Sequence, residues 1–150
     1  MTQTDTRMHF LVPDGFEADW LELRLALWPE DNEEGHRRGM ADARRRGHFV
    51  LLARNLENTL GFVEASMRHD YVNGTGGSPV GFLEGLFVVP ESRRRGVARA
   101  LVDRAVAWAR ERGCIEFASD CLLDNAAAHA VHRAIGFEES ERVVYFRRSI

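Results

Sequence analysis

The chain has 150 residues, of which 45% are hydrophobic and 29% charged, and its formal net charge is −3. These values are typical of a soluble globular protein, so we expect residues 1–150 to form a single domain with a substantial core. The negative charge argues against a nucleic-acid partner, and since all 20 lysine-or-arginine positions are arginine, a Schiff-base lysine, a lysine general base and a lysine-dependent phosphate loop are excluded.

The N-terminal segment MTQTDTRMHF lacks the basic-then-apolar pattern of a secretory signal, so we expect a cytoplasmic protein. No apolar run approaches the roughly 20 residues that span a bilayer, so no membrane partner is expected. The first predicted helix runs from Asp14, its cap, to Leu27, and Pro29 ends it. An acidic loop, Pro29 to Gly35, then precedes a second, charged helix from His36 to Arg46.

Three strands are predicted next, and the short turns between them favour an antiparallel meander. They run from His48 to Leu56, from Thr59 to Tyr71 and from Gly81 to Val89. Gly85 interrupts the third strand, and a glycine inside a strand often marks a β-bulge or a place where a ligand approaches the backbone. A bulge there would leave the backbone N–H groups of Leu86 to Val88 free to bind a ligand.

The C-terminal third alternates between helix and strand. A helix from Val97 ends at Gly113, a strand follows from Cys114 to Leu122, and Asp124 caps a helix that ends at Gly136. Glu141 to Ser149 is predicted as the last strand. Because a strand–helix–strand order implies a parallel pair, we predict an α+β (mixed α/β) fold: a mostly antiparallel mixed sheet flanked by helices, with one parallel strand pair.

Arginines crowd the start of the helix at Val97. Arg93, Arg94 and Arg95 directly precede Gly96 in the stretch VVPESRRRGVARA. A helix N-terminus has unpaired backbone N–H groups and a partial positive charge, and a glycine lets the chain pass close to a diphosphate. The turn therefore indicates a diphosphate site, although a basic surface turn would look the same.

Two motifs carry a resemblance to a known superfamily. R-x-x-G-x-A, Arg93 to Ala98 after an apolar strand that ends in V-V-P, resembles the acetyl-coenzyme A motif of the GCN5-related N-acetyltransferase (GNAT) superfamily. NAAAHAVHRAIGF, Asn125 to Phe137, is similar to its N-x-x-A…G-F segment. The resemblance covers most of the chain and implies the GNAT fold, acetyl-coenzyme A as cosubstrate in a cleft at the parallel strand pair, and no metal. The contacts that it implies are Leu86, Phe87, Val88, Arg93, Arg94, Arg95, Gly96, Val97, Ala98, Arg99 and Asn125.

One position departs from the superfamily pattern. Many members carry a tyrosine four residues before the G-F pair, where it protonates the leaving thiolate, and this chain has His132 there. An imidazolium could serve as the acid. The alternative is a hydrogen-bonded helix histidine without a catalytic role.

Further segments resemble the aminoglycoside 6'-N-acetyltransferases, which acetylate the 6'-amine of polycationic antibiotics and confer resistance. These segments are LWP, RHDYVNGTGGSPVGFLEGLFV, EFASD and GFEESERVVYF. The resemblance implies a homodimer, and some relatives carry histidine at the position of Asp31. The antibiotic contacts that it implies are Trp28, Asp31, Tyr71, Glu84, Asp120 and Glu141.

Carboxylates on or beside the strands that flank the predicted cleft favour a cationic acceptor. We take Glu84 as the candidate general base, through a water or directly, with Asp120 second and His132 as the candidate acid. The neutral amine would attack the thioester, and strand N–H groups would stabilise the oxyanion. Two alternatives stay open: an acetyltransferase for another amine, or a protein that binds acetyl-coenzyme A or the drug without turnover.

Overall fold

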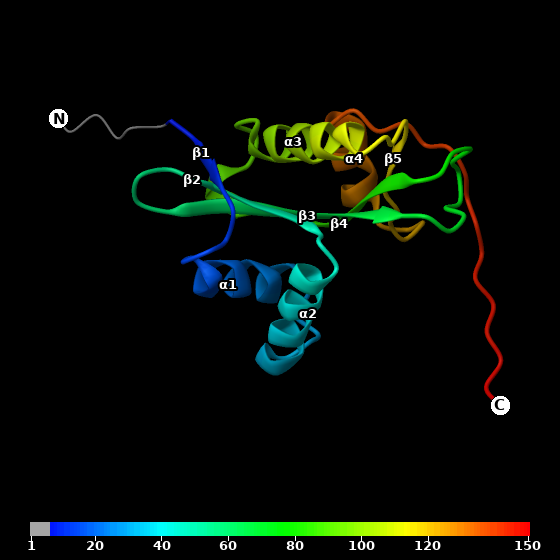
Figure 1. The fold of residues 1–150 in the computed structure, drawn as a ribbon, viewed down its shortest axis with the longest axis horizontal. Coiled ribbons are helices and arrows are strands. Elements are labelled where there is room, and N and C mark those ends of the chain that lie inside the picture. The colour runs from blue at the N-terminus through cyan, green and yellow to red at the C-terminus, as the bar shows by residue number, and fades with distance from the viewer. Residues whose placement is uncertain (1–6) are drawn as a thin grey trace.

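The computed structural model describes residues 7–150, so residues 1–6 of the N-terminal segment lie outside the described residues. A five-stranded sheet in the order β1-β2-β3-β4-β5 forms its centre (Figure 1). The first four strands are antiparallel neighbours, and β4 pairs with β5 in parallel. The predicted meander, the parallel pair and the α+β class are therefore confirmed. The strands are β1 (His9–Leu11), β2 (Phe49–Arg54), β3 (Thr59–Arg68), β4 (Val80–Val88) and β5 (Phe117–Ala118).

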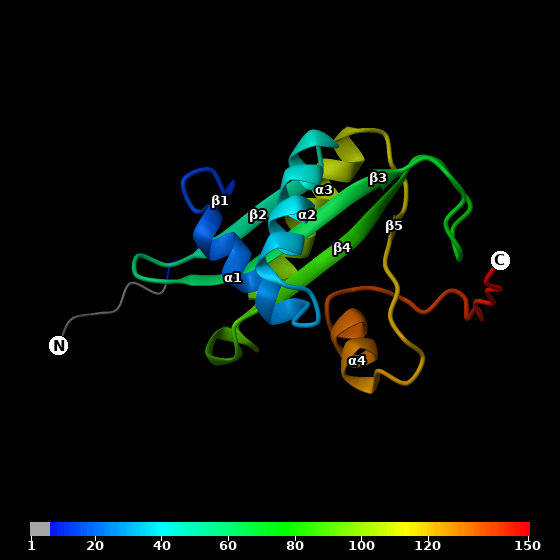
Figure 2. The ribbon, with the colours of Figure 1, turned by 90° about the horizontal axis from the view of Figure 1, so that it is seen from below.

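Helices cover both faces of the sheet. Helices α1 and α2 lie on one face and α3 on the other, as Figures 1 and 2 show. A short 3-10 helix, η1, leads from β4 into α3, and α4 follows β5. The bounds are α1 (Glu17–Leu27), α2 (Glu33–Arg45), η1 (Pro90–Ser92), α3 (Val97–Glu111) and α4 (Ala126–Ala134).

Alternation along the strands divides the interior into two layers. Phe62 of β3 packs with Trp20 in the layer beneath α1 and α2. Its neighbour Val63 points the other way and packs with Leu101 and Ala105 of α3. All five side chains are fully buried. Buried side chains therefore pack against both faces of β3 and β4, and this packing holds the part of β4 that carries the candidate site.

The helix starts differ from the prediction. Asn32 caps α2, accepting a hydrogen bond from the Gly35 N–H at 2.8 Å, so the helix takes in part of the predicted acidic loop. Helix α1 begins at Glu17, while Asp14 forms an ion pair with Arg44 instead of capping it. Helix α4 is capped by Asn125, one residue after the predicted cap.

The prediction of a last strand from Glu141 to Ser149 is wrong. The segment has no regular structure, and Figure 1 shows it running away from the sheet. Val144, Tyr145 and Phe146 are 76%, 78% and 93% exposed. Strand β5 is also much shorter than predicted, only two residues, so it offers too little edge to pair with the tail.

Candidate active site

Strands β4 and β5 stay side by side for only a short distance. Gly81 lies opposite Phe117 and Phe82 opposite Ala118. Beyond these pairs the two chains diverge, as Figure 2 shows. Within residues 7–150, the rest of this edge of β4 therefore has no strand partner. Its backbone N–H and C=O groups need hydrogen-bond partners, which an extended ligand can supply.

The other edge of β4 carries the predicted bulge. Leu86 to Val88 nevertheless stay paired with β3, so the open edge results from the divergence of β5 and not, as predicted, from the bulge. Glu64 of β3 pairs with Gly85, whereas Ala65 pairs with Leu83, so Glu84 is the extra residue. Gly85 has a packing reason to lack a side chain, since a Cβ there would lie 2.6 Å from Cη2 of Trp28. The glycine thus brings the Trp28 indole against the strand directly beside Glu84.

Trp28 is held from several sides. Its ring stacks on His36 with the centroids 6.3 Å apart, and it meets Phe62 edge-on at 6.4 Å. The guanidinium carbon of Arg24 lies 4.8 Å from the ring centroid. His36 Nε2 also lies 3.0 Å from the Trp28 carbonyl oxygen. The indole is therefore a fixed, half-buried wall of the site.

Replacing Gly85 with alanine tests this wall. The new methyl group would meet the ring of Trp28, which Arg24, His36 and Phe62 keep from retreating. Overpacking of this kind costs about 1–3 kcal/mol, so we expect Gly85→Ala to lose that much stability and to alter the tryptophan fluorescence. Denaturant unfolding followed by fluorescence measures both, and unchanged stability and emission would contradict the tight contact.

The turn between β4 and α3 has the shape of a phosphate site. Arg94 and Gly96 have positive φ angles, 62° and 81°. Helix α3 begins at Val97, and the Ala100 N–H bonds back to the Gly96 carbonyl at 3.0 Å. The backbone N–H groups that precede Ala100 in the first turn of α3 have no partner within the helix and point out of its N-terminal end. An anion placed there would also meet the positive end of the helix dipole.

The arginines of this turn have different tasks. Arg93 Nε donates to the Val88 carbonyl at 2.9 Å and ties the turn to β4. Arg99 Nη2 donates to the Ala134 carbonyl at 2.6 Å and joins α3 to α4. Arg94 and Arg95 are exposed, and the left-handed backbone at Arg94 turns the chain sharply there. Since Arg93 and Arg99 already donate to carbonyl groups, Arg94 and Arg95 are the arginines best suited to meet a diphosphate.

Helix α4 carries two of the candidate residues. The Asn125 side chain accepts a hydrogen bond from the Ala128 N–H at 3.0 Å, so its oxygen is engaged as the helix cap. His132 Nδ1 lies 2.6 Å from the Ala128 carbonyl oxygen, and its Nε2 lies 2.7 Å from Oγ of Ser119. Since a carbonyl only accepts, Nδ1 carries a proton. In the neutral ring Nε2 then accepts from Ser119, and in the imidazolium it donates.

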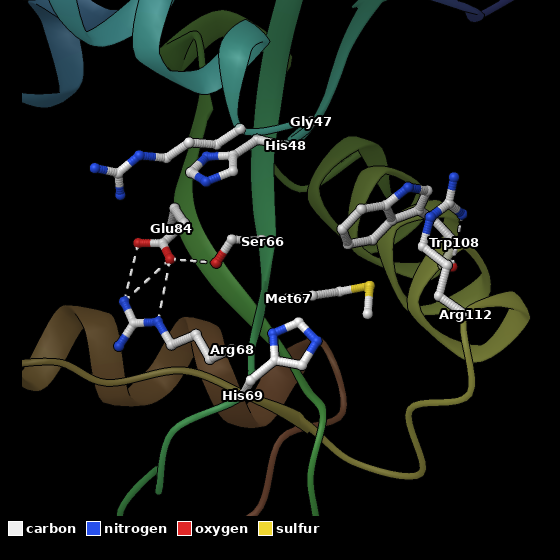
Figure 3. A pocket seen from close by; sticks show the side chains of 10 residues that line it. Gly47, His48, Ser66, Met67, Arg68, His69, Glu84, Trp108 and Arg112 are labelled. Atoms are coloured by element: carbon white, nitrogen blue, oxygen red, sulfur yellow. Dashed lines mark hydrogen bonds and ion pairs between the residues drawn. The ribbon is translucent and has the colours of Figure 1, made fainter.

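Glu84 lies at the centre of a polar cluster on β3 and β4 (Figure 3). Ser66 donates to its Oε1 at 2.5 Å, and Arg68 Nη2 lies 3.0 Å from Oε1 and 3.1 Å from Oε2. These residues line a cavity of about 510 Å³ that also reaches Trp108 of α3 and Arg112, which directly follows this helix. Glu84 is thus a partly exposed carboxylate with fixed partners at the margin of a cavity.

The other candidate carboxylates are exposed. The parallel register of Phe82 with Ala118 brings Asp120 to the same step along its chain as Glu84, where the two chains have begun to separate. Asp31 lies in the loop before α2 and accepts from the Asn32 N–H at 2.8 Å. These two and Glu84 lie on separate elements.

Tyr71 and Glu141 lie apart from Glu84, on two segments that contact each other: the loop between β3 and β4 and the start of the C-terminal tail. Tyr71 is 75% exposed on the loop between β3 and β4. A Cβ on Gly74 of this loop would lie 3.5 Å from the Glu141 Cβ, so the loop and the start of the tail are in contact. Two residues before Glu141, a hydrogen bond from Arg142 and its positive charge hold the pKa of Glu139 below its usual value.

Three polar neighbours were not among the predicted site residues: Ser66 and Arg68 beside Glu84, and Glu64, the buried partner of Trp20 and Arg24. The available signal was the polar run at alternate positions of a strand that is otherwise apolar. Residues two apart share a face, so Glu64, Ser66 and Arg68 were bound to align. The sequence alone did not show that this face adjoins Glu84.

Within the described part of the chain, no cluster of three or more His, Cys, Asp or Glu side chains is arranged to hold a metal ion. The helices of residues 7–150 are also all too short or too polar to cross a membrane.

An opened parallel strand pair, a bulged strand and a helix start suited to a diphosphate are the arrangement expected of an acetyltransferase. Residues 14–137 match the model of the Acetyltransferase (GNAT) family, and the chain belongs to that family. It is 48% identical over 141 residues to an aminoglycoside N(6')-acetyltransferase type 1 of Acinetobacter genomosp. 13, covering 93% of this chain and 96% of the relative. Within the family it groups with the aminoglycoside 6'-N-acetyltransferases.

Solved structures agree with this grouping. An aminoglycoside antibiotic 6'-N-acetyltransferase from Acinetobacter baumannii superimposes with a TM-score of 0.91 at 46% identity, covering 96% of this chain and 99% of that one. An aminoglycoside N-acetyltransferase in complex with coenzyme A gives a TM-score of 0.92 at 37% identity, with both chains fully covered.

Proposed function

We propose that this chain transfers the acetyl group of acetyl-coenzyme A to the 6'-amine of aminoglycoside antibiotics and thereby confers resistance to them. One observation carries the proposal: Glu84, a partly exposed carboxylate, sits on the bulge of β4 beside an unpaired strand edge. The proposed base and the proposed cosubstrate site would thus adjoin on one strand. The relatives named above support both the reaction and the choice of acceptor.

The unpaired edge of β4 and the helix start of α3 fit the two parts of acetyl-coenzyme A. The extended pantetheine arm would pair with the backbone from Leu86 to Val88, and the diphosphate would meet the first turn of α3. Asn125, at the start of α4, would reach the arm through its amide nitrogen, since its oxygen caps the helix. The residues proposed for this site are Leu86, Phe87, Val88, Arg93, Arg94, Arg95, Gly96, Val97, Ala98, Arg99 and Asn125.

The acceptor is an ammonium ion at neutral pH and must lose a proton before it can attack. Glu84 is the proposed base, and Asp120 is the second candidate because its chain runs beside β4 at the same step. The neutral amine then attacks the thioester carbon. Backbone N–H groups between Leu86 and Val88 would stabilise the developing oxyanion.

The leaving thiolate needs a proton, and His132 is the proposed source. Its Nδ1 is held by the Ala128 carbonyl, so only Nε2, which faces Ser119, can exchange a proton. The imidazolium would give up the Nε2 proton and return to the neutral tautomer that the helix favours.

Aromatic and acidic side chains would bind the rest of the drug. Trp28 offers a fixed apolar wall, and cationic ring substituents would pair with exposed carboxylates in the manner of electrostatic steering. The residues proposed for drug contacts are Trp28, Asp31, Tyr71, Glu84, Asp120 and Glu141.

The test follows thiol release from acetyl-coenzyme A. Steady turnover with kanamycin or tobramycin, and none with a paromomycin-type drug that has a 6'-hydroxyl, would establish the reaction and its position. Turnover only with other amines would replace the acceptor. Stoichiometric release, or binding without any release, would contradict an enzyme.

We further propose that the protein is a homodimer. The apolar run of Val143 to Phe146 is exposed, and contiguous exposed apolar residues of this kind mark interaction sites. A second copy is the fitting occupant, since the tail has the strand pattern that this chain does not pair. We also propose that residues 1–150 act as one domain and that the enzyme works in the cytoplasm.

Charges in the tail should separate the dimer. In Val144→Asp with Phe146→Asp, two exposed apolar side chains become acidic, so we expect a protein with the mass of a single chain. Light scattering after size exclusion measures the mass, with Arg147→Asp and Arg148→Asp as a control for added acidity alone. A single-chain mass for the unaltered protein would contradict the proposed dimer.

A further inference from the structure

We propose that Arg68 is a placeholder cation: it occupies on Glu84 the position that the acceptor's ammonium group takes, and the drug must displace it to bind. This inference rests on the proposed role of Glu84 as the base that receives the acceptor amine. It adds a residue of β3 to the set that governs acceptor binding.

The geometry of the pair leaves little room for a second cation. Arg68 Nη2 bridges both carboxylate oxygens of Glu84, at 3.0 and 3.1 Å, and its Nε lies 3.3 Å from Oε1. Ser66 occupies another position on Oε1. Figure 3 shows the guanidinium and the hydroxyl on separate sides of the carboxylate. An ammonium group that is to reach both oxygens must therefore take the place of the guanidinium.

The two partners of Glu84 differ in their freedom to move. Ser66 is 4% exposed, so its hydroxyl stays in place and keeps the carboxylate oriented. The Arg68 side chain is 42% exposed, at the last residue of β3, and its guanidinium rests 3.5 Å from the centroid of the Phe82 ring. Ion pairs this exposed are weak, because water replaces the lost partner. Arg68 can therefore leave the carboxylate while Ser66 remains, and what it gives up is an exposed ion pair and the contact with the Phe82 ring.

The exchange also has a chemical consequence. An ammonium that replaces the guanidinium leaves Glu84 paired with a positive charge, so the carboxylate is never left bare. An uncharged acceptor cannot make this exchange without leaving the partly buried carboxylate unpaired, which is unfavourable. The site would thus admit cations one for one.

The test measures drug affinity in the protein saturated with coenzyme A, where no acetyl transfer occurs. Titration calorimetry with kanamycin gives the Kd of the unaltered protein and of Arg68→Gln. Because the drug no longer competes with a guanidinium, we expect the Kd to fall about two- to fivefold, the range set by an exposed ion pair. A gain of affinity is a result that damage to the fold does not produce.

Two further variants separate displacement from general charge. Arg112→Gln removes the same charge from the same cavity on the α3 side, where Arg112 bonds to the Trp108 carbonyl and not to Glu84. Its Kd should change much less than that of Arg68→Gln. In a Glu84→Gln background, Arg68→Gln should have no further effect on Kd.

An unchanged or larger Kd in Arg68→Gln would overturn the inference. So would an equal gain in drug affinity in Arg112→Gln, or a gain in affinity from Arg68→Gln that persists without the Glu84 carboxylate. If Glu84→Gln alone leaves both drug affinity and turnover unchanged, the proposed role of Glu84 fails first, and that outcome is distinct from a failure of Arg68.

Discussion

Glu84→Gln should lower kcat for a 6'-amino drug about 10²- to 10⁴-fold, the range for loss of a general base. The amide keeps the size of the side chain and can still accept the Ser66 hydroxyl bond, but it cannot take the proton of the ammonium. Thiol release under saturating substrates measures kcat. Coenzyme A binding should stay unchanged, because the side chain of Glu84 contacts β3 rather than the open edge of β4.

Asp120→Asn is the matched control for Glu84. It makes the same chemical change at the neighbouring carboxylate, which is exposed and lies beyond the last paired residue of β5. We expect it to affect kcat less than Glu84→Gln and to raise KM. If the larger kcat loss instead follows Asp120→Asn, the base is Asp120, and Glu84 is a binding group.

Glu64→Ala should destabilise the fold by about 3–5 kcal/mol, because removing one partner of a buried ion pair leaves the other charge buried and unpaired. The side chains of Arg24 and Glu64 are 11% and 4% exposed. Trp20 Nε1 also donates to Glu64 Oε1 at 2.8 Å, so the alanine leaves two donors without their acceptor. Urea unfolding measures the free energy change.

Two control variants separate the cost of burying an unpaired charge from the loss of an ion pair alone. Glu33→Ala breaks an exposed pair with Arg37 on α2 and should change stability by less than about 1 kcal/mol. Replacing both buried partners, Glu64→Leu with Arg24→Met, should recover much of the loss, since apolar side chains need no partner there. A loss in Glu64→Ala no larger than in Glu33→Ala would refute the cost of the buried pair.

The local features of the site were readable from the sequence because each follows from a neighbouring residue. Gly85 in an apolar strand predicted a bulge, and the register shift at Glu84 confirms it. Arg93 to Gly96 predicted a turn into a helix start, which the positive φ angles of Arg94 and Gly96 confirm. The turn follows from backbone rules that act over a few residues. The bulge depends in addition on the pairing of β4 with β3 and on the close approach of Trp28 to Gly85.

Contacts between distant segments were not readable in this way. Glu64 meets Arg24 across 40 positions and Trp20 across 44, and a strand pattern records only that Glu64 shares a face with Ser66. Ser66 and Arg68 became neighbours of Glu84 only because β3 and β4 pair in one particular register. The sequence pattern predicted which residues are polar, but not which of them meet.

The C-terminal tail likewise depends on contacts that the sequence pattern does not reveal. Its alternating apolar residues predicted a strand, and that pattern describes what Glu141 to Ser149 can form when an edge is available. Strand β5 ends at Ala118, so this chain offers it too little edge, and Tyr145 and Phe146 stay exposed. The turn at Arg94 and Gly96, the start of α3 at Val97 and the family motifs were thus determined by the sequence itself, through short-range sterics and hydrogen bonding. Which carboxylate is buried, which is paired and which strand finds a partner were decided by the tertiary structure, because these depend on how distant segments pack.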